Sequence, residues 1–453
     1  MTECNQTVFP FEVHFLRQVV AGFDGARMTT DGGALLLRAV DRKIDLLKRV
    51  AACFTDARAP ERVEHALPEL LAQRIYALAL GYEDLNDHEE LRRDPLLALV
   101  AGKRELAEPL AGKSTLNRLE LSRAGEGRDE RYHKISYLGE AIDALLVEIF
   151  LEAHAKPPQQ IVLDLDATDT PLHGQQEARF FHGYYGHYCY LPLYIFCEDH
   201  LLCARLRPSN QDASAGSVEE VERIVRQIGS RWPHVRIILR GDSGFCREEL
   251  MAWCEKHRVD YVFGFARNQR LRRKIVAPMR QAKEEHRRTA KAARVFAEFS
   301  YRTRSSWSQA RRVVAKAEYL EKGENPRYLV TSLETRGWPA QKLYERLYCA
   351  RGEMENRIKE QLSLFSDRLS TETLRANQLR LYFSSLAYVL LHALRRLALA
   401  GTEWATAQVE TIRLRLLKIA AEVRLTARRI WVRYSRAYPW KTIFAIAYAA
   451  LSS

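Results

Sequence analysis

The sequence predicts an α/β protein: a mixed β-sheet with helices on both faces, interrupted by a β-rich insertion and flanked by helical N- and C-terminal regions. Two observations lead to this class. Hydrophobic residues recur at helical spacing up to about Leu151, and after a Pro-rich break at 156–160 short apolar, β-branched runs alternate with helical segments. The 453 residues are 47% hydrophobic and 28% charged, which is typical of a globular chain long enough for several domains.

The N-terminal region, residues 1–157, is predicted to form helices. Its leucines and isoleucines follow helical spacing, for example Leu71, Ile75 and Leu78. Ser114 precedes another such run and is expected to start a helix. A helical bundle with a solvated face is the simplest interpretation of this region.

Residues 158–267 are predicted to form the first part of a core in which strands and helices alternate. Strands are expected at 161–166, 188–197, 200–206, 235–239 and 261–265, and helices at 217–230 and 247–257. The first of these helices should begin with a capping box formed by Ser217 and Glu220. A three-stranded meander followed by helix–strand repeats with right-handed crossovers gives one mixed sheet, and this is the order of an RNase H-like fold.

Residues 268–338 are expected to form the β-rich insertion. A very basic run opens it, and strands are predicted after that run at 295–301, 312–319 and 328–332. The insertion therefore separates the last predicted core strand from the last core helix.

Residues 339–400 are predicted to carry that last helix, followed by packing helices. The helix should begin near Pro339, a residue that favours the first turn, and continue to about Leu364. Residues 401–453 contain many arginines and are predicted to be a basic helical C-terminal region.

Three acidic residues lie where this fold would bring them together. Asp166 ends the first strand, and Asp242 follows the fourth, which lies beside the first in an RNase H-like sheet. Glu355 is far along the chain, but it lies on the last core helix, which can pack on the sheet. Asp164 shares one face of the first strand with Asp166, so Asp164 or the nearby Asp169 remains open as the first acid.

Clustered carboxylates predict a site for divalent metal ions. They raise one another's pKa unless cations lie between them, and oxygen-only ligands favour Mg²⁺ or Mn²⁺ over zinc. Two such ions, about 4 Å apart, can activate a water or a 3′-hydroxyl for in-line attack on a phosphodiester. A net charge of +13 agrees with a polyanionic partner, of which nucleic acid is the simplest. The acids therefore predict a metal-dependent nuclease or strand-transfer site, although each aspartate alone could simply end a strand in a turn.

Four further side chains are candidates for contacts with nucleic acid. Tyr348, Arg351 and Lys359 fall on the helical face of Glu355, where the cations could hold phosphate oxygens and the tyrosine could hydrogen-bond or stack. Trp307, in an arginine-rich part of the insertion, could stack on a flipped base. The alternative for Trp307 is a buried core aromatic.

Cysteine usage and the N-terminus predict a cytoplasmic protein without a membrane partner. The eight cysteines are scattered singly, with no C-x-x-C pair, as expected in a reducing compartment. No basic patch followed by an apolar run marks a signal peptide. The longest apolar stretch, 381–391, is too short to span a bilayer.

Three motifs resemble those of one enzyme family. Asp166-Ala167-Thr168 is similar to the D-x-T of its first motif, Arg240-Gly241-Asp242-Ser243-Gly244-Phe245 to its second, and Tyr348-x-x-Arg351-x-x-x-Glu355 to its third. Over residues 161 to about 391 the chain resembles a bacterial insertion-sequence transposase of the DDE class (transposase DDE domain group 1, insertion sequence 1380-like). The related signature has a lysine seven residues after the glutamate, where Leu362 stands here, and Lys359 is the expected substitute.

The resemblance implies a DNA transposase that cleaves the ends of an insertion sequence and joins them to target DNA by two-metal phosphodiester transfer. Asp166, Asp242 and Glu355 would be the catalytic residues and the ligands of two Mg²⁺ or Mn²⁺ ions. The partners would be double-stranded DNA, both element ends and target, and further copies of the chain in a homodimer or larger assembly. Residues 1–157 would bind the DNA ends or mediate dimerisation, and the protein would be associated with the nucleoid.

Two other functions remain open from the sequence. One is an RNase H-like metal-dependent nuclease without strand transfer. The other is a catalytically inactive DNA-binding derivative.

Overall fold

The computed structural model describes residues 8–123 and 133–452, and the chain folds into two compact units. The first unit combines the described residues of Met1–Ala51, Arg58–Leu119 and Leu390–Ser453, so both ends of the chain belong to it. The second unit consists of Ala52–Ala57 and the described residues of Glu120–Val389. The five regions predicted from the sequence, with the functions assigned to them, stay predictions.

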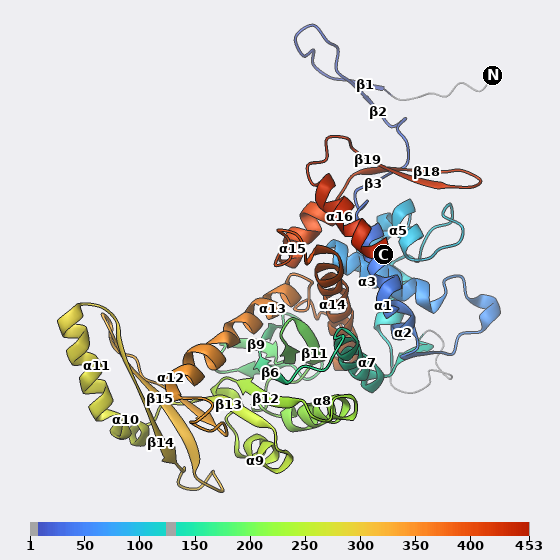
Figure 1. The fold of residues 1–453 in the computed structure, drawn as a ribbon. Coiled ribbons are helices and arrows are strands. Elements are labelled where there is room, and N and C mark those ends of the chain that lie inside the picture. Colours follow the sequence, from blue (N-terminus) through green and yellow to red (C-terminus); the bar gives the residue numbers. More distant parts are fainter. Residues whose placement is uncertain (1–7, 124–132, 453) are drawn as a thin grey trace, which may run out of the picture. The chain divides into compact units, whose positions relative to one another are not determined.

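The second unit is built on a nine-stranded mixed sheet (Figure 1). The strands run in the order β11-β10-β6-β12-β13-β17-β15-β14, and β16 pairs with β15. Their bounds are β6 Gln160–Ala167, β10 Leu193–Cys197, β11 His200–Arg205, β12 Arg236–Gly241, β13 Asp260–Phe265, β14 Ala293–Tyr301, β15 Arg311–Leu320, β16 Gly323–Glu324 and β17 Arg327–Thr331.

The first five strands in that order confirm the predicted RNase H-like arrangement. β10 is antiparallel to both of its neighbours, whereas β6, β12 and β13 run parallel to one another. Parallel neighbours need a crossover connection. Helix α9 (Glu248–His257) supplies it between β12 and β13, and α8 (Ser217–Arg231) leads from β11 into β12.

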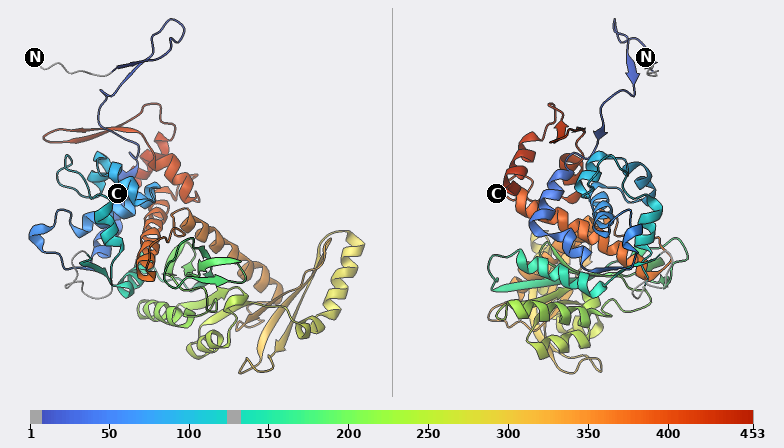
Figure 2. Two further views of the ribbon diagram at one scale, coloured as in Figure 1. Left: turned by 180° about the vertical axis from the view of Figure 1, so that it is seen from behind. Right: turned by 90° about the vertical axis from the view of Figure 1, so that its right-hand side faces the viewer.

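Helices cover both faces of this sheet, as predicted (Figures 1 and 2). On one face α7 (Gly139–Glu152), α8 and α9 pack against alternate residues of the strands, including Leu163 and Leu165 of β6. On the other face β12 and β13 pack against the helical segment that begins with α12. Because side chains alternate along a strand, Asp164 and Asp166 point to this second face.

The β-rich insertion continues the same sheet. β17 pairs with β13, and β15 and β14 extend the sheet beyond it, all antiparallel. The basic run folds into α10 (Gln269–Lys274) and α11 (Val276–Thr289). Met279 and Ala282 of α11 are buried, and the helix packs against β14 and β15. This burial of one face stabilises a helix whose other side chains are mostly charged.

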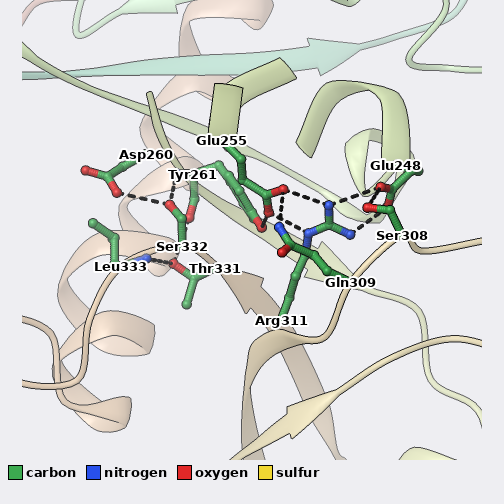
Figure 3. A network of polar contacts seen from close by, with 10 residues as sticks. All are labelled: Glu248, Glu255, Asp260, Tyr261, Ser308, Gln309, Arg311, Thr331, Ser332 and Leu333. Atoms are coloured by element: carbon green, nitrogen blue, oxygen red, sulfur yellow. Dashed lines mark hydrogen bonds and ion pairs between the residues drawn. The ribbon is translucent and has the colours of Figure 1, made fainter. Parts of the chain in front are cut away.

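A buried arginine ties the insertion to the core (Figure 3). Arg311, at the start of β15, donates from Nε to Glu255 and from Nη1 to Glu248, both at 2.6 Å and both on α9. The arginine side chain is 2% exposed, so loss of either carboxylate would leave a buried charge poorly compensated. The cluster therefore holds β15, and with it β17, in a fixed position beside β13.

The last core helix is not the regular helix that the sequence predicted. α12 (Ala340–Lys342) is followed by a π-helical turn (Leu343–Tyr348), a 3₁₀ turn (Cys349–Arg351) and α13 (Gly352–Leu362). Leu347 of the π-helical turn is buried against the sheet. The changes of helical pitch fall within the third motif, because Tyr348 ends the π-helical turn and Arg351 ends the 3₁₀ turn, and such irregular turns are frequent at functional sites.

The second unit also contains two small sheets and the part of a long helix that precedes Leu390. β4 (Phe54–Asp56) pairs with β5 (Ile135–Tyr137), and β9 (His187–Tyr190) pairs with β7 (Thr170–Pro171) and β8 (Phe180–His182). α14 (Leu374–Leu394) contains the longest apolar run. Among the described residues, no helix combines the length and the apolarity needed to cross a membrane.

The first unit is mainly helical, which agrees with the helical flanks expected from the sequence. Its helices are α1 Ala34–Ile44, α2 Leu46–Ala51, α3 Leu67–Leu80, α4 His88–Leu91, α5 Pro95–Val100, α6 Lys113–Glu120, α15 Val409–Ile412 and α16 Lys441–Ser452, with 3₁₀ turns at Pro60–Arg62 and Leu85–Asp87 and π-helical turns at Arg395–Leu399 and Arg413–Leu417. Two strands near the N-terminus, β1 (Val8–Pro10) and β2 (Val20–Gly22), form a separate pair.

The prediction of helix throughout residues 401–453 was wrong. β18 (Ala421–Leu425) and β19 (Ile430–Tyr434) form an antiparallel hairpin, and β18 also pairs with β3 (Met28–Thr29). The prediction gave most weight to the arginines of the tail. The strand signal is the alternation of buried and less buried residues in the first half of β18, which is the two-residue period of a strand.

Two local predictions in the core were also wrong. The strand expected at 188–197 is interrupted, and β9 and β10 belong to different sheets, because Pro192 between them has no N–H to donate to a ladder. Ser217 does not cap α8: Gly216, with φ of 73°, occupies the cap position, and the Ser217 hydroxyl is buried without a hydrogen-bond partner. Glu220 accepts hydrogen bonds from two arginine side chains, so the capping box does not form.

Candidate active site

The register of two parallel strands brings the first two acids of the predicted trio together. Leu165 of β6 is paired with Gly241 of β12. The next residues along the two strands, Asp166 and Asp242, therefore lie side by side where both strands end at the same edge of the sheet. The predicted strand order placed the ends of the two strands close together. The observed register identifies Asp166 and Asp242 as the neighbouring residues.

Each aspartate is oriented by a backbone amide of its own turn. Oδ1 of Asp242 accepts a hydrogen bond from the amide of Gly244 at 2.8 Å and caps the 3₁₀ turn Ser243–Phe245. Oδ1 of Asp166 accepts from the amide of Ala167 at 3.0 Å. In both cases one carboxylate oxygen is held in place by the backbone.

Arg351 connects the third acid to the first. Its Nη1 donates to Oδ2 of Asp166 at 3.4 Å, and its Nη2 donates to Oε1 of Glu355 at 3.0 Å. Glu355 lies in the first turn of α13, four residues after the arginine, as an (i, i+4) pair on one helical face. The Glu355 side chain is 51% exposed, so its carboxylate has room to change position.

The charges of the three acids act on one another. Burial raises the pKa of Asp166 to about 6, and Asp242 and Glu355 add to the increase, whereas Arg351 opposes it. Burial alone would lower the pKa of Arg351, but the three acids and Tyr348 raise it above its usual range. The electrostatics thus agree with the geometry: Asp166 and Glu355 contact the guanidinium of Arg351, and Asp242 acts on it at longer range.

The two alternatives to Asp166 are engaged elsewhere. Asp164 is 4% exposed, and its two oxygens accept from Nε and Nη2 of Arg240 at 2.5 and 2.6 Å. Nη1 of the same arginine donates to the carbonyl of Leu347 at 2.5 Å, so this pair attaches the last core helix to the sheet. Asp169 lies 2.7 Å from Nε2 of His187. Burial raises the pKa of Asp164 although Arg240 opposes it.

Two of the four predicted contact residues line a cleft beside the acids. Tyr348 and Arg351, together with Asp242, form part of the wall of a cavity of about 540 Å³. Burial raises the pKa of the Tyr348 hydroxyl, which therefore stays protonated and able to donate. Lys359, one turn beyond Glu355, is exposed, and no contact joins it to the trio in the part of the chain that the structure describes.

Trp307 is a core residue in this structure. Its side chain is 4% exposed and stacks on Phe265 at 5.0 Å between ring centroids, with Tyr301 at 5.9 Å in an edge-to-face arrangement. The indole therefore corresponds to the buried-aromatic alternative, and no ring face is open to a base.

The sequence interpretation missed the cleft itself and the glycine that permits it. A Cβ on Gly264 of β13 would lie 2.7 Å from Oη of Tyr348 and 3.2 Å from the carbonyl carbon of Asp242. A larger residue would push the third motif away from the second. The available signal was a glycine inside an otherwise bulky strand, which often marks a close approach of another chain segment.

The donor chemistry of the trio suits divalent cations, although the carboxylates are not drawn together as ligands. Between residues 8–123 and 133–452, no three His, Cys, Asp or Glu side chains are close enough to hold one ion. Three carboxylates beside one guanidinium nevertheless leave the cluster anionic, and Asp242 and Glu355 add to the increase that burial causes in the pKa of Asp166. The residues therefore fit a metal site in which Arg351 has moved aside.

A family model described as transposase DDE domain group 1 matches residues 11–453. The chain belongs to this family. The predicted DDE class is thereby confirmed, whereas the bacterial insertion-sequence group stays a prediction. No curated protein matches the sequence.

One solved structure similar to this transposase-family chain is the piggyBac transposase in a synaptic complex with hairpin DNA, determined by cryo-electron microscopy. The two chains are 10% identical, with a TM-score of 0.43 over 87% of this chain and 80% of that chain. At this TM-score the two structures differ too much for positions to be compared residue by residue.

Proposed function

We propose that this family member is a DNA transposase that cleaves element ends and joins them to target DNA at Asp166, Asp242 and Glu355. The observation that carries the proposal is that Arg351 contacts both Asp166 and Glu355, while the strand register places Asp242 beside Asp166. Family membership supports the same reaction class.

The residues of the chain would prepare the site in different ways. The two aspartates supply oxygens whose orientation is set by backbone amides, and Glu355, half exposed, supplies one that can adjust. Two Mg²⁺ or Mn²⁺ ions held by these acids would activate the attacking oxygen and stabilise the leaving one. With the acids neutralised, Arg351 would be free to bind a phosphate oxygen, which its forked donors fit well.

The test is DNA cleavage by purified protein in Mg²⁺, on a plasmid that carries the coding sequence with its natural flanks. Asp242→Asn and Glu355→Gln should reduce cleavage about a thousandfold or more, because several kcal/mol of transition-state stabilisation is lost. Glu353→Gln is the matched control, since it makes the same change of charge on the same helix outside the trio. Full cleavage by Glu355→Gln would contradict the proposal.

Strand joining separates the transposase from its two competitors. A transposase links the cleaved 3′ ends to a second plasmid, whereas an RNase H-like nuclease stops after cleavage. A catalytically inactive derivative binds DNA without cutting it at all. Cleaved ends that never join the second plasmid would favour the nuclease.

An assembly of at least two copies is part of the proposal. The segment from β1 to Phe23 exposes an unusual number of large apolar side chains: Val8, Phe9, Phe11, Val13, Phe15, Leu16, Val19, Val20 and Phe23. A two-stranded hairpin is not stable alone in water, and another copy of the chain is the partner that a reaction on paired DNA ends would bring. Light scattering should give the mass of a dimer or larger particle for the full chain and a smaller mass for Phe15→Asp/Leu16→Asp. An unchanged mass would contradict this assignment, and the predicted nucleoid association stays untested.

A further inference from the structure

Arg267 and the cations of the β-rich insertion fall into three groups. Those of the first group are neutralised by nearby carboxylates: Arg288, Arg294, Arg311, Arg312 and Lys316 each form an ion pair with a glutamate. Those of the second group have no ion pair among the residues that the structure describes: Arg267, Arg272, Arg273, Arg280, Lys283 and Arg327. All six of the second group line two hollows, the first of which contains Asp242. The third group also has no ion pair among the described residues but lies outside both hollows: Arg270, Lys274, Arg287, Lys291, Arg302, Arg304, Lys322 and Arg336.

The first hollow is the cleft that contains Asp242. Arg267, just after β13, and Arg327, at the start of β17, lie on its wall together with Phe265 and Tyr328. The half-buried rings of Phe265 and Tyr348 also line the cleft, which therefore combines cations with aromatic rings directly beside Asp242. Grooves that hold unpaired nucleic acid strands have this combination, because cations bind the phosphates and rings stack on bases.

Tyr328, which contributes to the wall of this cleft, carries an unpaired polar atom. The hydroxyl of Tyr328 is buried, the residue is 3% exposed, and no hydrogen-bond partner is present in the described structure. Burial raises the pKa of this tyrosine to about 12, so the hydroxyl remains a donor. A buried hydroxyl without a partner destabilises a fold, and a ligand acceptor would satisfy it.

The second hollow adjoins the first, because Pro326 lines both. It measures about 440 Å³ and lies along α10 and α11. Four cations line it against the single acid Glu324: Arg272, Arg273, Arg280 and Lys283. Val276, 54% exposed, adds an apolar surface.

We propose that the two hollows form one track that holds an unpaired DNA strand as it leaves the acid trio, with its phosphates on the six unpaired cations. This inference rests on the proposed function, since it assigns a path to the DNA of that reaction. The insertion would then be a strand guide attached to the core by the Arg311 cluster. The strand could belong to the flanking DNA or to the element end, and the polarity of the bound arm distinguishes the two.

The experiment measures binding of two fluorescent DNA duplexes without divalent metal. One is blunt, and the other carries a single-stranded arm of about ten nucleotides, a length typical of single-strand sites. Wild-type protein should bind the armed duplex more tightly than the blunt one. Arg273→Gln/Arg280→Gln should remove most of that preference and lower the slope of log affinity against log salt by about 1.4, which is about 0.7 for each lost phosphate contact.

The matched control is Arg287→Gln/Lys291→Gln, which removes the same charge near the end of α11, away from both hollows. This control should bind the armed duplex as wild type does. If it loses the preference for the armed duplex to the same extent, the effect comes from the overall positive charge and the track is contradicted. Wild-type protein without a preference for the armed duplex would also overturn it. Preference for a 3′ arm or a 5′ arm identifies which strand follows the track.

Tyr328→Phe provides a second readout that does not depend on charge. Loss of the unpaired hydroxyl should raise the melting temperature of the free protein and weaken binding of the armed duplex several-fold. Tyr319→Phe on β15, outside both hollows, is the control. If Tyr328→Phe leaves the affinity for the armed duplex unchanged, the hydroxyl does not contact the bound strand.

Cleavage assays keep this inference separate from the proposed function. Asp242→Asn should abolish cleavage and leave the preference for the armed duplex intact. Track variants that lose arm binding in a protein that never cleaves DNA would support the track and contradict the transposase. If those variants bind the armed duplex normally while the wild-type enzyme cleaves DNA, the result would contradict the track and support the transposase.

Discussion

Two Arg–Asp pairs, two residues apart on β6, have opposite characters. Asp164 and Arg240 form a buried, two-pronged pair at 2.5 and 2.6 Å that also ties the last core helix to the sheet. Asp166 and Arg351 meet through one contact of 3.4 Å, and the arginine is shared with Glu355. Residues on the same face of one strand thus have different roles. The inner pair, Asp164 and Arg240, fixes the last core helix to the sheet. The outer pair, Asp166 and Arg351, keeps its charges available to a ligand.

The position along the strand explains the difference. Asp164 lies inside the paired region of β6 and β12, where Arg240 is its direct neighbour in register. Asp166 lies at the end of that ladder, beside a cleft and an exposed helix terminus. Water and ligands reach only the second position, and a charged pair that they reach can exchange partners.

The largest expected effect lies on the outer pair. Asp166→Asn should reduce Mg²⁺-dependent DNA cleavage about a thousandfold or more, because one metal-binding carboxylate is lost. This expectation follows from the proposed role of Asp166 as a metal ligand. DNA binding should persist, since the substitution adds no negative charge. Cleavage at the wild-type rate would move the first acid to another residue.

The inner pair should show the largest effect on stability. Asp164→Ala leaves the Arg240 guanidinium buried without its carboxylate, which should cost about 3–5 kcal/mol in urea unfolding. Asp169→Ala is the control, because that aspartate is more exposed and pairs with a partly exposed histidine. Equal stability of the two variants would show that the inner pair is not structural.

A third prediction concerns pH. The pKa of Asp166 is about 6 in the metal-free fold, above its ordinary value of 3.8. The folded state therefore binds the proton more tightly than the unfolded chain, and this contribution to stability is complete below about pH 4 and lost as the pH rises through about 6. Asp166→Asn should thus be more stable than metal-free wild type at pH 7.5, by about 1–3 kcal/mol.

The gain should largely disappear by about pH 4, where Asp166 is protonated in the folded state and about half protonated in the unfolded chain. Thermal unfolding of both proteins in EDTA between pH 4 and pH 7.5 measures it. A gain that does not depend on pH would assign the effect to packing.

The smallest expected effect concerns Lys359. It is exposed and lies one turn beyond Glu355, and a single phosphate contact contributes little at physiological salt. Lys359→Gln should weaken DNA binding about two- to fivefold and leave the cleavage rate at saturating DNA unchanged. A much larger loss of the cleavage rate would place this lysine inside the reacting site.

The secondary-structure elements differ in how well the sequence predicts them. The five core strands could be located from their apolar, β-branched runs, because burial on both faces leaves a clear local signal. The hairpin Ala421–Tyr434 could not, since its strands are partly exposed and four arginines are distributed over its strands and turn. The break before β10 was visible as Pro192, but the adjoining aromatic residues outweighed it.

The order of the elements along the chain and the three motifs are local properties of the sequence. The fold class and the three candidate acids could therefore be predicted from the residues alone. Three features depended on packing between distant segments. These are the pairing of Leu165 with Gly241, the arginine that contacts both Asp166 and Glu355, and the hollows lined by unpaired cations. A local pattern records which side chains are buried, but the distance between two charges is determined only when strands and helices pack in three dimensions.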